Sequence, residues 1–255
     1  MIDTHSHIYS EEFDADIAQT IQRAKDAGVK HIIMPNIDSE SLPRMLALES
    51  SFPGYCSAAI GLHPTSVKTN YLEELALVKS ELERRKYIAV GEIGIDLYWD
   101  KTYMNEQIIA FQQQVEWALF YKLPIIIHTR NSFQETMNAL YPYKNKGLKG
   151  VFHSFGGTIK EAEQMFEIGD FSLGINGIVT FKNAGLAEIL SKIDIQKIIL
   201  ETDSPYLTPN PYRGKRNESA FLALICKKMA EIYELSIEKV SEITTQNSTK
   251  LFKIN

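Results

Sequence analysis

Short runs of apolar and β-branched residues alternate with longer amphipathic stretches along most of the chain. Such runs, bounded by polar or turn-forming residues, predict β-strands. We expect eight strands, at Met1–His5, His31–Ile37, Cys56–Leu62, Ile88–Ile93, Pro124–His128, Gly150–His153, Phe171–Ile175 and Lys197–Glu201. Between them, apolar residues recur at the spacing of one helix face. The predicted helices are Asp14–Ala27, Ser41–Ser50, Leu72–Arg84, Asn105–Tyr121, Ser132–Leu140, Ile159–Glu167, Ala184–Lys192 and Phe221–Glu234.

Strands that alternate with helices of this length predict parallel βαβ units. Eight such units in about 250 residues match a TIM (β/α)8 barrel, an α/β fold with helices outside a parallel eight-stranded barrel. A doubly wound open sheet is the alternative, but its site gathers at one switch point, whereas ligand-type residues here come from many strands. No Pro/Gly linker divides the chain, so we expect one domain, residues 1–255. In it, Ser204–Asn217 forms a long loop and Ser236–Phe252 two further short helices on the outside.

Composition and charge narrow the possible partners. The chain has 255 residues, 44% of them hydrophobic, and a net charge of −5. This charge argues against a protein that coats nucleic acid, but it leaves room for a local basic patch. No apolar run approaches the roughly 20 residues of a membrane span, and the N-terminus lacks a signal-peptide pattern. With Cys56 and Cys226 in separate elements, we expect a reduced, cytoplasmic protein with no membrane contact and no obligate protein partner.

Residues that bind divalent metals stand where the predicted strands end. Imidazole and carboxylate are the usual ligands of Zn²⁺, Mn²⁺ and related ions. In a barrel, the carboxyl ends of the strands meet at one rim, where catalytic groups belong. His31 instead opens its strand, at the opposite rim, so we expect a structural or solvated role for it. The strand-end residues are His5, His7, His63, Glu92, His128, His153 and Asp203.

The two histidines of His5-Ser-His7 can reach one ion, because residues two apart in an extended chain face the same side. Glu92 interrupts an apolar strand, and a buried carboxylate is unfavourable unless it is paired or metal-bound. We expect it to bridge two cations, one to each oxygen; the alternative is an ion pair with a buried arginine. His128 and His153 suit the second ion, although each alone could be a core histidine.

Asp203 and Glu201 share one face of the last predicted strand. Asp203 lies nearer the mouth, so it is the better metal ligand and the better general base. Glu201 lies deeper, where it orients a ligand or a substrate-positioning group, or else forms a structural ion pair. The set predicts a two-metal hydrolase, in which a pair of cations activates water. A site with net positive charge near +1 favours an anionic substrate such as a phosphodiester.

Side chains beyond the metal ligands also favour a nucleic-acid substrate. Arg130 follows His128 by two residues and is placed to clamp a phosphate. Tyr98 and Trp99 lie in the loop after Glu92, where they can stack on bases. Arg213 belongs to a basic rim in the loop after Asp203 that continues to Arg216. Each feature has an ordinary alternative, since loop aromatics often pack and basic loops are often solvated.

Together these segments resemble the TatD family of metal-dependent deoxyribonucleases, within the amidohydrolase-like superfamily. They occur in order over residues 1 to about 220, and the combination is far more specific than any one of them. They are Asp3-Thr-His-Ser-His7, Gly61-Leu-His-Pro64, Val90-Gly-Glu-Ile-Gly94, Leu123-Pro-Ile-Ile-Ile-His128, His153-Ser-Phe-Gly-Gly157, Leu200-Glu-Thr-Asp-Ser-Pro-Tyr206 and Arg213-Gly-Lys-Arg-Asn-Glu218.

The resemblance implies a barrel that binds two divalent cations. One would be held by His5, His7, Glu92 and Asp203, and the other by Glu92, His128 and His153. It also implies hydrolysis of DNA, single-stranded or at its ends, often as an exonuclease. The metal is Mg²⁺, Mn²⁺ or Zn²⁺: the family is commonly assayed with Mg²⁺, whereas imidazole-rich sites prefer Zn²⁺ or Mn²⁺.

Two other functions compete with the nuclease. An amidohydrolase or esterase could act on a small molecule with the same metal pair. Many such barrels use a carbamylated lysine as the bridge, so Glu92 and the nearby arginines favour the nuclease. A non-enzymatic scaffold with a dead site is the other rival, and the intact ligand set speaks against it, because Glu92 and Asp203 are both present.

Overall fold

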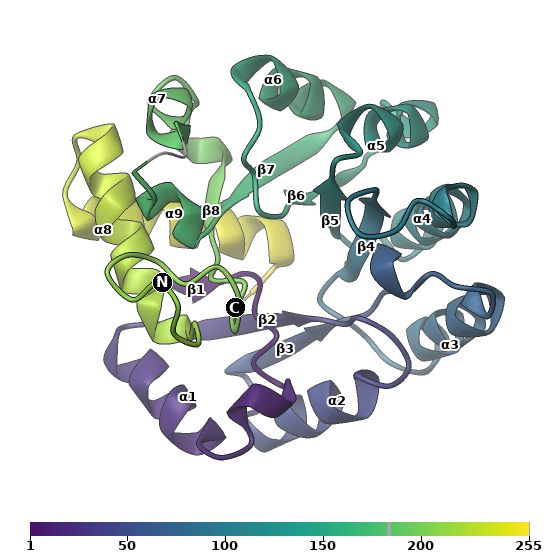
Figure 1. Cartoon of the computed structure of the whole chain (residues 1–255), viewed down its shortest axis with the longest axis horizontal. Helices are drawn as coiled ribbons and strands as arrows, with labels where there is room; N and C mark the ends of the chain where they lie inside the picture. Colours follow the sequence, from purple (N-terminus) through teal and green to yellow (C-terminus); the bar gives the residue numbers. More distant parts are fainter. Residues whose placement is uncertain (183–184, 255) are drawn as a thin grey trace.

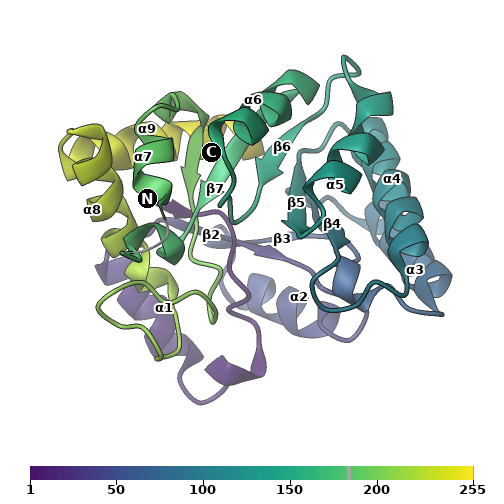
Figure 2. The ribbon, with the colours of Figure 1, turned by 45° about the horizontal axis from the view of Figure 1, so that its top comes forward.

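Eight parallel strands form a ring in the computed structural model, with helices around its outside (Figures 1 and 2). The structure describes residues 1–182 and 185–254. The strands are β1 (Ile2–Asp3), β2 (His31–Pro35), β3 (Cys56–Ala59), β4 (Val90–Asp96), β5 (Ile125–Arg130), β6 (Lys149–Phe152), β7 (Asp170–Ile175) and β8 (Ile198–Leu200).

Two seams close the strands into a barrel. β1 to β3 pair in sequence order, as do β4 to β8. Between β3 and β4, Ile60 forms a parallel bridge with Val90. Between β8 and β1, the Thr4 amide donates to Leu200 O at 3.1 Å, and the Asp203 amide donates to His5 O at 2.9 Å. The predicted barrel is therefore confirmed, and the open doubly wound sheet is wrong because the first and last strands meet.

The helices follow the strands as the amphipathic stretches predict. Of the predicted helix Ala184–Lys192, Ala184 lies outside the described residues. None of the described helices has both the length and the apolarity needed to cross a membrane. Their bounds are α1 (Ile17–Asp26), α2 (Leu42–Ser51), α3 (Tyr71–Arg84), α4 (Met104–Tyr121), α5 (Phe133–Leu140), α6 (Ile159–Ile168), α7 (Leu186–Leu190), α8 (Leu222–Tyr233) and α9 (Ile237–Phe252).

The C-terminal residues differ from their prediction, because α9 is one helix rather than two. Neither Gly nor Pro interrupts it, and its buried positions continue at helix spacing from Val240 to Phe252. Its last turn packs Leu251 and Phe252 against the barrel's inner residues rather than on the outside, and its yellow ribbon passes behind the strands in Figure 1. These inner residues are Ile33, Ala59, Ala89, Ile126, Val151 and Ile199.

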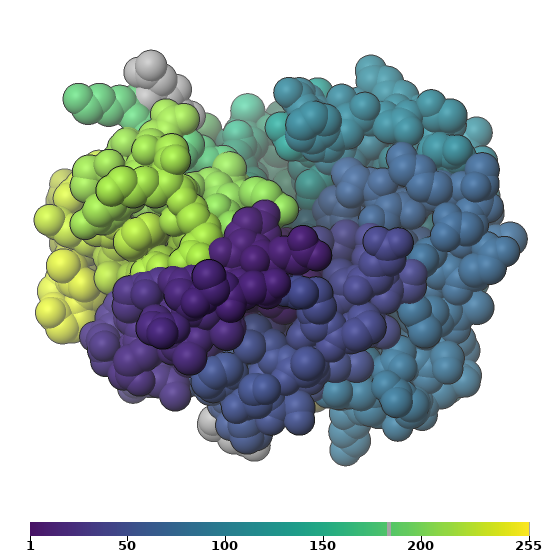
Figure 3. Space-filling model, turned by 60° about the horizontal axis from the view of Figure 1, so that its bottom comes forward, coloured from purple at the N-terminus to yellow at the C-terminus, as the bar shows by residue number. Residues whose placement is uncertain are grey.

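The long loop after β8 is attached to the segment after β1, and Figure 3 shows the two lying against each other. Arg216 donates to both carboxylate oxygens of Asp16, at 2.7 and 2.9 Å. Asn217 is fully buried and donates to Thr202 O and Tyr206 O, on either side of Asp203. Arg216, which the sequence places on a flexible cationic rim, thus has a structural partner. Asn217 holds the backbone that carries Asp203.

Candidate metal centre

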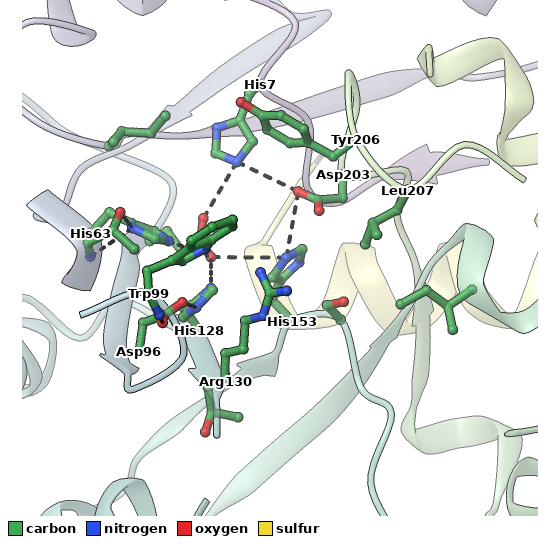
Figure 4. Close-up of a pocket in the computed structure, with 16 residues that line it drawn as sticks. His7, His63, Asp96, Trp99, His128, Arg130, His153, Asp203, Tyr206 and Leu207 are labelled. Carbon is green, nitrogen blue, oxygen red and sulfur yellow. Dashed lines mark hydrogen bonds and ion pairs between the residues drawn. The ribbon is translucent and has the colours of Figure 1, made fainter. Parts of the chain in front are cut away.

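The strand-end side chains surround a pocket of about 670 Å³ at the carboxyl rim of the barrel. In Figure 4, His7, His128, His153 and Asp203 point toward one centre. His31 lies at the opposite rim, where its ring nitrogens contact Gly54 O and Ser57 Oγ. Of the candidate residues, those that line the pocket are His7, His63, Glu92, Trp99, His128, Arg130, His153 and Asp203.

His5 lies beneath the pocket, and three other strand-end side chains, His7, Glu92 and Asp203, approach its Nε2 to within 3.7 Å. His5 Nε2 lies 3.1 Å from His7 Nε2 and 3.1 Å from Glu92 Oε2. Asp203 Oδ1 lies 3.7 Å from each of the two imidazole nitrogens. Ligands about 2.1 Å from a tetrahedral ion are about 3.4 Å from one another. The donor atoms and their separations therefore fit a divalent cation.

Burial sets the charge state of this group. His5 is fully buried, and burial lowers its pKa well below the ordinary value. The ring is therefore neutral, which is the form in which imidazole binds a metal. Burial also raises the pKa of Asp203 to about 6. A cation among these groups would offset the unfavourable burial of the carboxylate.

The second oxygen of Glu92 faces a different set of histidines. Glu92 Oε1 lies 2.9 Å from His128 Nδ1, 3.4 Å from His63 Nε2 and 4.0 Å from His153 Nε2. Burial raises the pKa of Glu92, but the surrounding imidazoles, His5 first, hold it well below its ordinary value. Among the described residues its ion-pair partners are histidines rather than an arginine. Its two oxygens thus face two sides of the pocket.

Neighbouring side chains determine which ring nitrogen can bind a metal. Tyr9 donates its hydroxyl proton to Pro35 O at 2.6 Å, so at 3.0 Å it accepts from His7 Nδ1–H. The Nε2 lone pair of His7 is then free. His63 is the reverse case, because the Thr65 amide donates to its Nδ1 at 3.2 Å. A neutral His63 therefore carries its proton on Nε2 and faces Glu92 as a donor.

His153 rests on Glu201, the deeper of the two acids from the last strand. Its Nδ1 lies 2.9 Å from Glu201 Oε1, and the same oxygen accepts from the Ser154 amide at 2.7 Å. The negative charge of Glu201 raises the pKa of His153 to about 10, against the opposing effect of burial. A Cβ at Gly174 would clash with the Glu201 carboxylate, so this glycine leaves the space that Glu201 fills.

Sequence reasoning missed three residues that orient the histidines. Tyr9 and Thr65 act through the hydrogen bonds just described. Asp96 is buried at the end of β4, with Oδ2 2.8 Å from His128 Nε2. The available signal was its position four residues after Glu92, on the same face of a strand. The predicted strand ends at Ile93, whereas β4 continues to Asp96.

At the rim, Arg130 stacks on exposed aromatic rings. Its guanidinium carbon lies 3.9 Å from the Tyr98 ring centre and 5.4 Å from that of Trp99. Trp99 is 68% exposed and lines the pocket, whereas Tyr98 does not line it. Arg213 stacks on Phe181 at 4.1 Å and also lies outside the lining. Arg130 and Trp99 are therefore the members of the predicted basic-aromatic rim that face the pocket.

Residues 2–253 match the protein family described as TatD related DNase. The chain belongs to this family. It is 34% identical over 256 residues to YabD of Bacillus subtilis, an uncharacterized metal-dependent hydrolase, with all of both chains covered. It is 30% identical over 260 residues to the 3'-5' ssDNA/RNA exonuclease TatD of Erwinia billingiae, covering 100% of this chain and 99% of the relative.

The crystal structure of the TatD homolog YjjV from Escherichia coli has the same fold. It superposes with a TM-score of 0.93 at 29% identity, covering 100% of this chain and 98% of that chain. The family resemblance inferred from the sequence motifs is thus confirmed. The protein is a metal-dependent hydrolase of the TatD family with a clustered His, Glu and Asp site.

Proposed function

We propose that this TatD-family protein hydrolyses phosphodiester bonds at the ends of single-stranded DNA, using two divalent cations. The observation that carries the proposal is that the two carboxylate oxygens of Glu92 face two different sets of histidines. Its Oε2 lies 3.1 Å from His5 Nε2, while its Oε1 lies 2.9 Å from His128 Nδ1. A carboxylate in that position is suited to bridge two ions, as in two-metal hydrolases.

The proposed ligands are the strand-end atoms that face Glu92 and Asp203. His5, His7, Glu92 Oε2 and Asp203 Oδ1 would hold one cation, and Glu92 Oε1, His128 and His153 the other. His63 is left out because its neutral ring presents a proton to Glu92. When bound, such ions supply Lewis-acid chemistry, polarising a phosphate and lowering the pKa of water.

The protein's own residues would position the substrate and accept a proton. Asp203 contacts His5, His7 and His153 through Oδ1, so Oδ2 can take a proton from the attacking water. The water oxygen bonds to phosphorus, the bond from phosphorus to the leaving oxygen breaks, and that oxygen is protonated by solvent. With cations bound at Glu92, the His63 Nε2–H, 3.4 Å from Glu92 Oε1, would turn to a phosphate oxygen, and Arg130 and Trp99 would hold the next phosphate and base.

Two features support a nucleic-acid end as the substrate. Arg130 is a cation at the pocket mouth of a protein whose overall charge is −5, so anion recognition is local. A pocket of about 670 Å³ suits a nucleotide-sized group rather than a continuous duplex. The name of the Erwinia billingiae relative, an exonuclease on ssDNA and RNA, agrees with this choice.

A small-molecule ester or amide is the second candidate substrate class. Ile37, Ile178 and Leu207 give the pocket an apolar side, which a compact organic substrate would use. In that case, the same ligand set would activate water against a carbonyl carbon.

The decisive experiment uses 5'-labelled single-stranded DNA and chelator-stripped protein, with Mg²⁺, Mn²⁺ or Zn²⁺ restored separately. We expect metal-dependent shortening that Asp203→Asn abolishes. Asp170→Asn is the matched control, because Asp170 is an exposed carboxylate at the opposite rim, paired with Lys197. Intact DNA under every metal, with turnover of small esters instead, would move the function to the second candidate.

A further inference from the structure

Asp96 touches both the metal centre and the pocket rim. It is 1% exposed. One carboxylate oxygen, Oδ2, lies 2.8 Å from His128 Nε2. The other, Oδ1, accepts from the backbone amides of Tyr98 at 2.9 Å and Trp99 at 3.2 Å. A single buried side chain thus joins a proposed metal ligand to the turn that presents Trp99.

Gln107, on α4, holds the backbone of Asp96. The Asp96 amide donates to Gln107 Oε1 at 2.8 Å, and Gln107 Nε2 donates to Asp96 O at 3.2 Å. Gln107 is itself 3% exposed. Because this paired contact fixes the main chain, the carboxylate is held from behind while its oxygens orient His128 and the turn.

The contact determines how His128 presents its ring. An ionised carboxylate only accepts hydrogen bonds, so Asp96 requires a proton on His128 Nε2. Nδ1 is the atom that faces Glu92 Oε1, so a cation bound there would replace the Nδ1 proton while Asp96 keeps the proton on Nε2. A carboxylate behind a ligating histidine fixes the tautomer and raises the basicity of the ligand.

We propose that Asp96 is a positioning residue that couples metal binding at His128 to the Trp99 turn. This inference rests on the proposed metal site. Loss of the carboxylate should weaken metal binding and free the turn together, because one oxygen contacts His128 and the other accepts from the amides of the turn. If Asp96 had a purely structural role, replacing it would change the stability of the fold and leave metal affinity unaltered.

The test measures Mn²⁺ affinity by competition with a chelator, in a Trp117→Phe background where Trp99 is the only tryptophan. Asp96→Asn should weaken Mn²⁺ binding by about 10- to 100-fold and change Trp99 emission. Asp100→Asn is the matched control. Asp100 lies in the same loop and accepts from the Thr102 amide, but it is exposed and bonded to Lys68. It should leave Mn²⁺ affinity unchanged.

A second measurement uses the unaltered protein and does not depend on a variant that folds. In protein loaded with Zn²⁺, ¹⁵N spectra of the histidine rings should show His128 with a proton on Nε2 and none on Nδ1, the resonance being assigned by its loss in His128→Gln. A proton on Nδ1, or unchanged Mn²⁺ affinity in a folded Asp96→Asn, would overturn the inference alone. Failure of the wild type to bind any divalent cation would instead overturn the proposed function.

Discussion

His63 and His128 face the same carboxylate oxygen of Glu92 with opposite ring nitrogens. Thr65 fixes His63 as a donor at Nε2, whereas Asp96 holds the Nε2 proton of His128 and leaves Nδ1 as the atom that a cation can bind. Two histidines on either side of the strand that carries Glu92 thus have different chemistry. The difference comes from the hydrogen bond on the far side of each ring.

This difference predicts the behaviour of His63 variants. His63→Ala should lower kcat by about 10²- to 10³-fold, because it removes a donor aimed at the reacting group. Metal stoichiometry should stay at the wild-type value. His63→Gln, whose amide N–H reaches the place of Nε2, should recover part of the lost rate. Single-turnover hydrolysis and metal analysis check both; loss of one bound metal in His63→Ala would show that His63 is a ligand.

Gly174 allows a second prediction at the residue scale. Gly174→Ala places a methyl group against Glu201, so we expect a loss of about 1–3 kcal/mol of folding free energy from overpacking. Metal binding should weaken as well, since Glu201 supports His153. Gly156→Ala is the control, because a Cβ there meets no atom within 4 Å. Urea denaturation measures the difference, and equal stability of both variants would contradict the packing argument.

The ligand-type residues could be predicted from the sequence because each one ends a strand, and a barrel brings such ends together. Their supporting residues could not. Tyr9 and Thr65 act across turns whose direction depends on the folded backbone. Asp96 follows Gly94, a residue with φ of 148° that the strand pattern does not anticipate. Hydrogen bonds behind a ring require three-dimensional neighbours, which a pattern of apolar positions does not supply.

At the scale of elements, α9 closes one end of the barrel, because Leu251 and Phe252 in its last turn pack against the inner residues of the strands. The strand and helix order was predictable from apolar spacing, because each element buries one face or both. That α9 is one continuous helix, and where it lies, could not be predicted, because its polar residues resemble those that end shorter helices. Thr244 and Ser248 donate to carbonyls one turn earlier, at 2.8 Å each, so their hydroxyls are satisfied within the helix.

The closing role of α9 predicts unequal effects for two phenylalanines. Phe252→Ala should lower the free energy of unfolding by about 3–5 kcal/mol, because Phe252 is 4% exposed and packs on the barrel interior. Phe120→Ala, at 75% exposure on α4, should change it by less than about 0.5 kcal/mol. Guanidinium denaturation compares them. Similar losses at both sites would mean that α9 does not support the barrel.

For the molecule as a whole, a net charge of −5 opposes a polyanionic substrate except where cations dominate locally, as at Arg130. Binding of single-stranded DNA to metal-free protein should therefore depend weakly on salt, with a slope near −0.7 for each phosphate contacted. Arg130→Gln should make that slope less steep by about 0.7, the value for one phosphate contact. Lys228→Gln, on α8 and paired with Glu231, should not. Fluorescence anisotropy across a salt series measures both; parallel slopes would remove Arg130 from the DNA-binding surface.

The seam between β1 and β8 joins His5 to Asp203, residues that lie far apart in the sequence. The Asp203 amide bonds to His5 O, and the two side chains meet only when this seam forms. Phe252, which packs into the barrel, lies later still in the chain. Until Asp203 has been made, a growing chain therefore carries β1 without β8 beside it and an incomplete set of metal ligands. Activity appears only when the two distant parts of the chain have met, so a truncated product is expected to be inert rather than partly active.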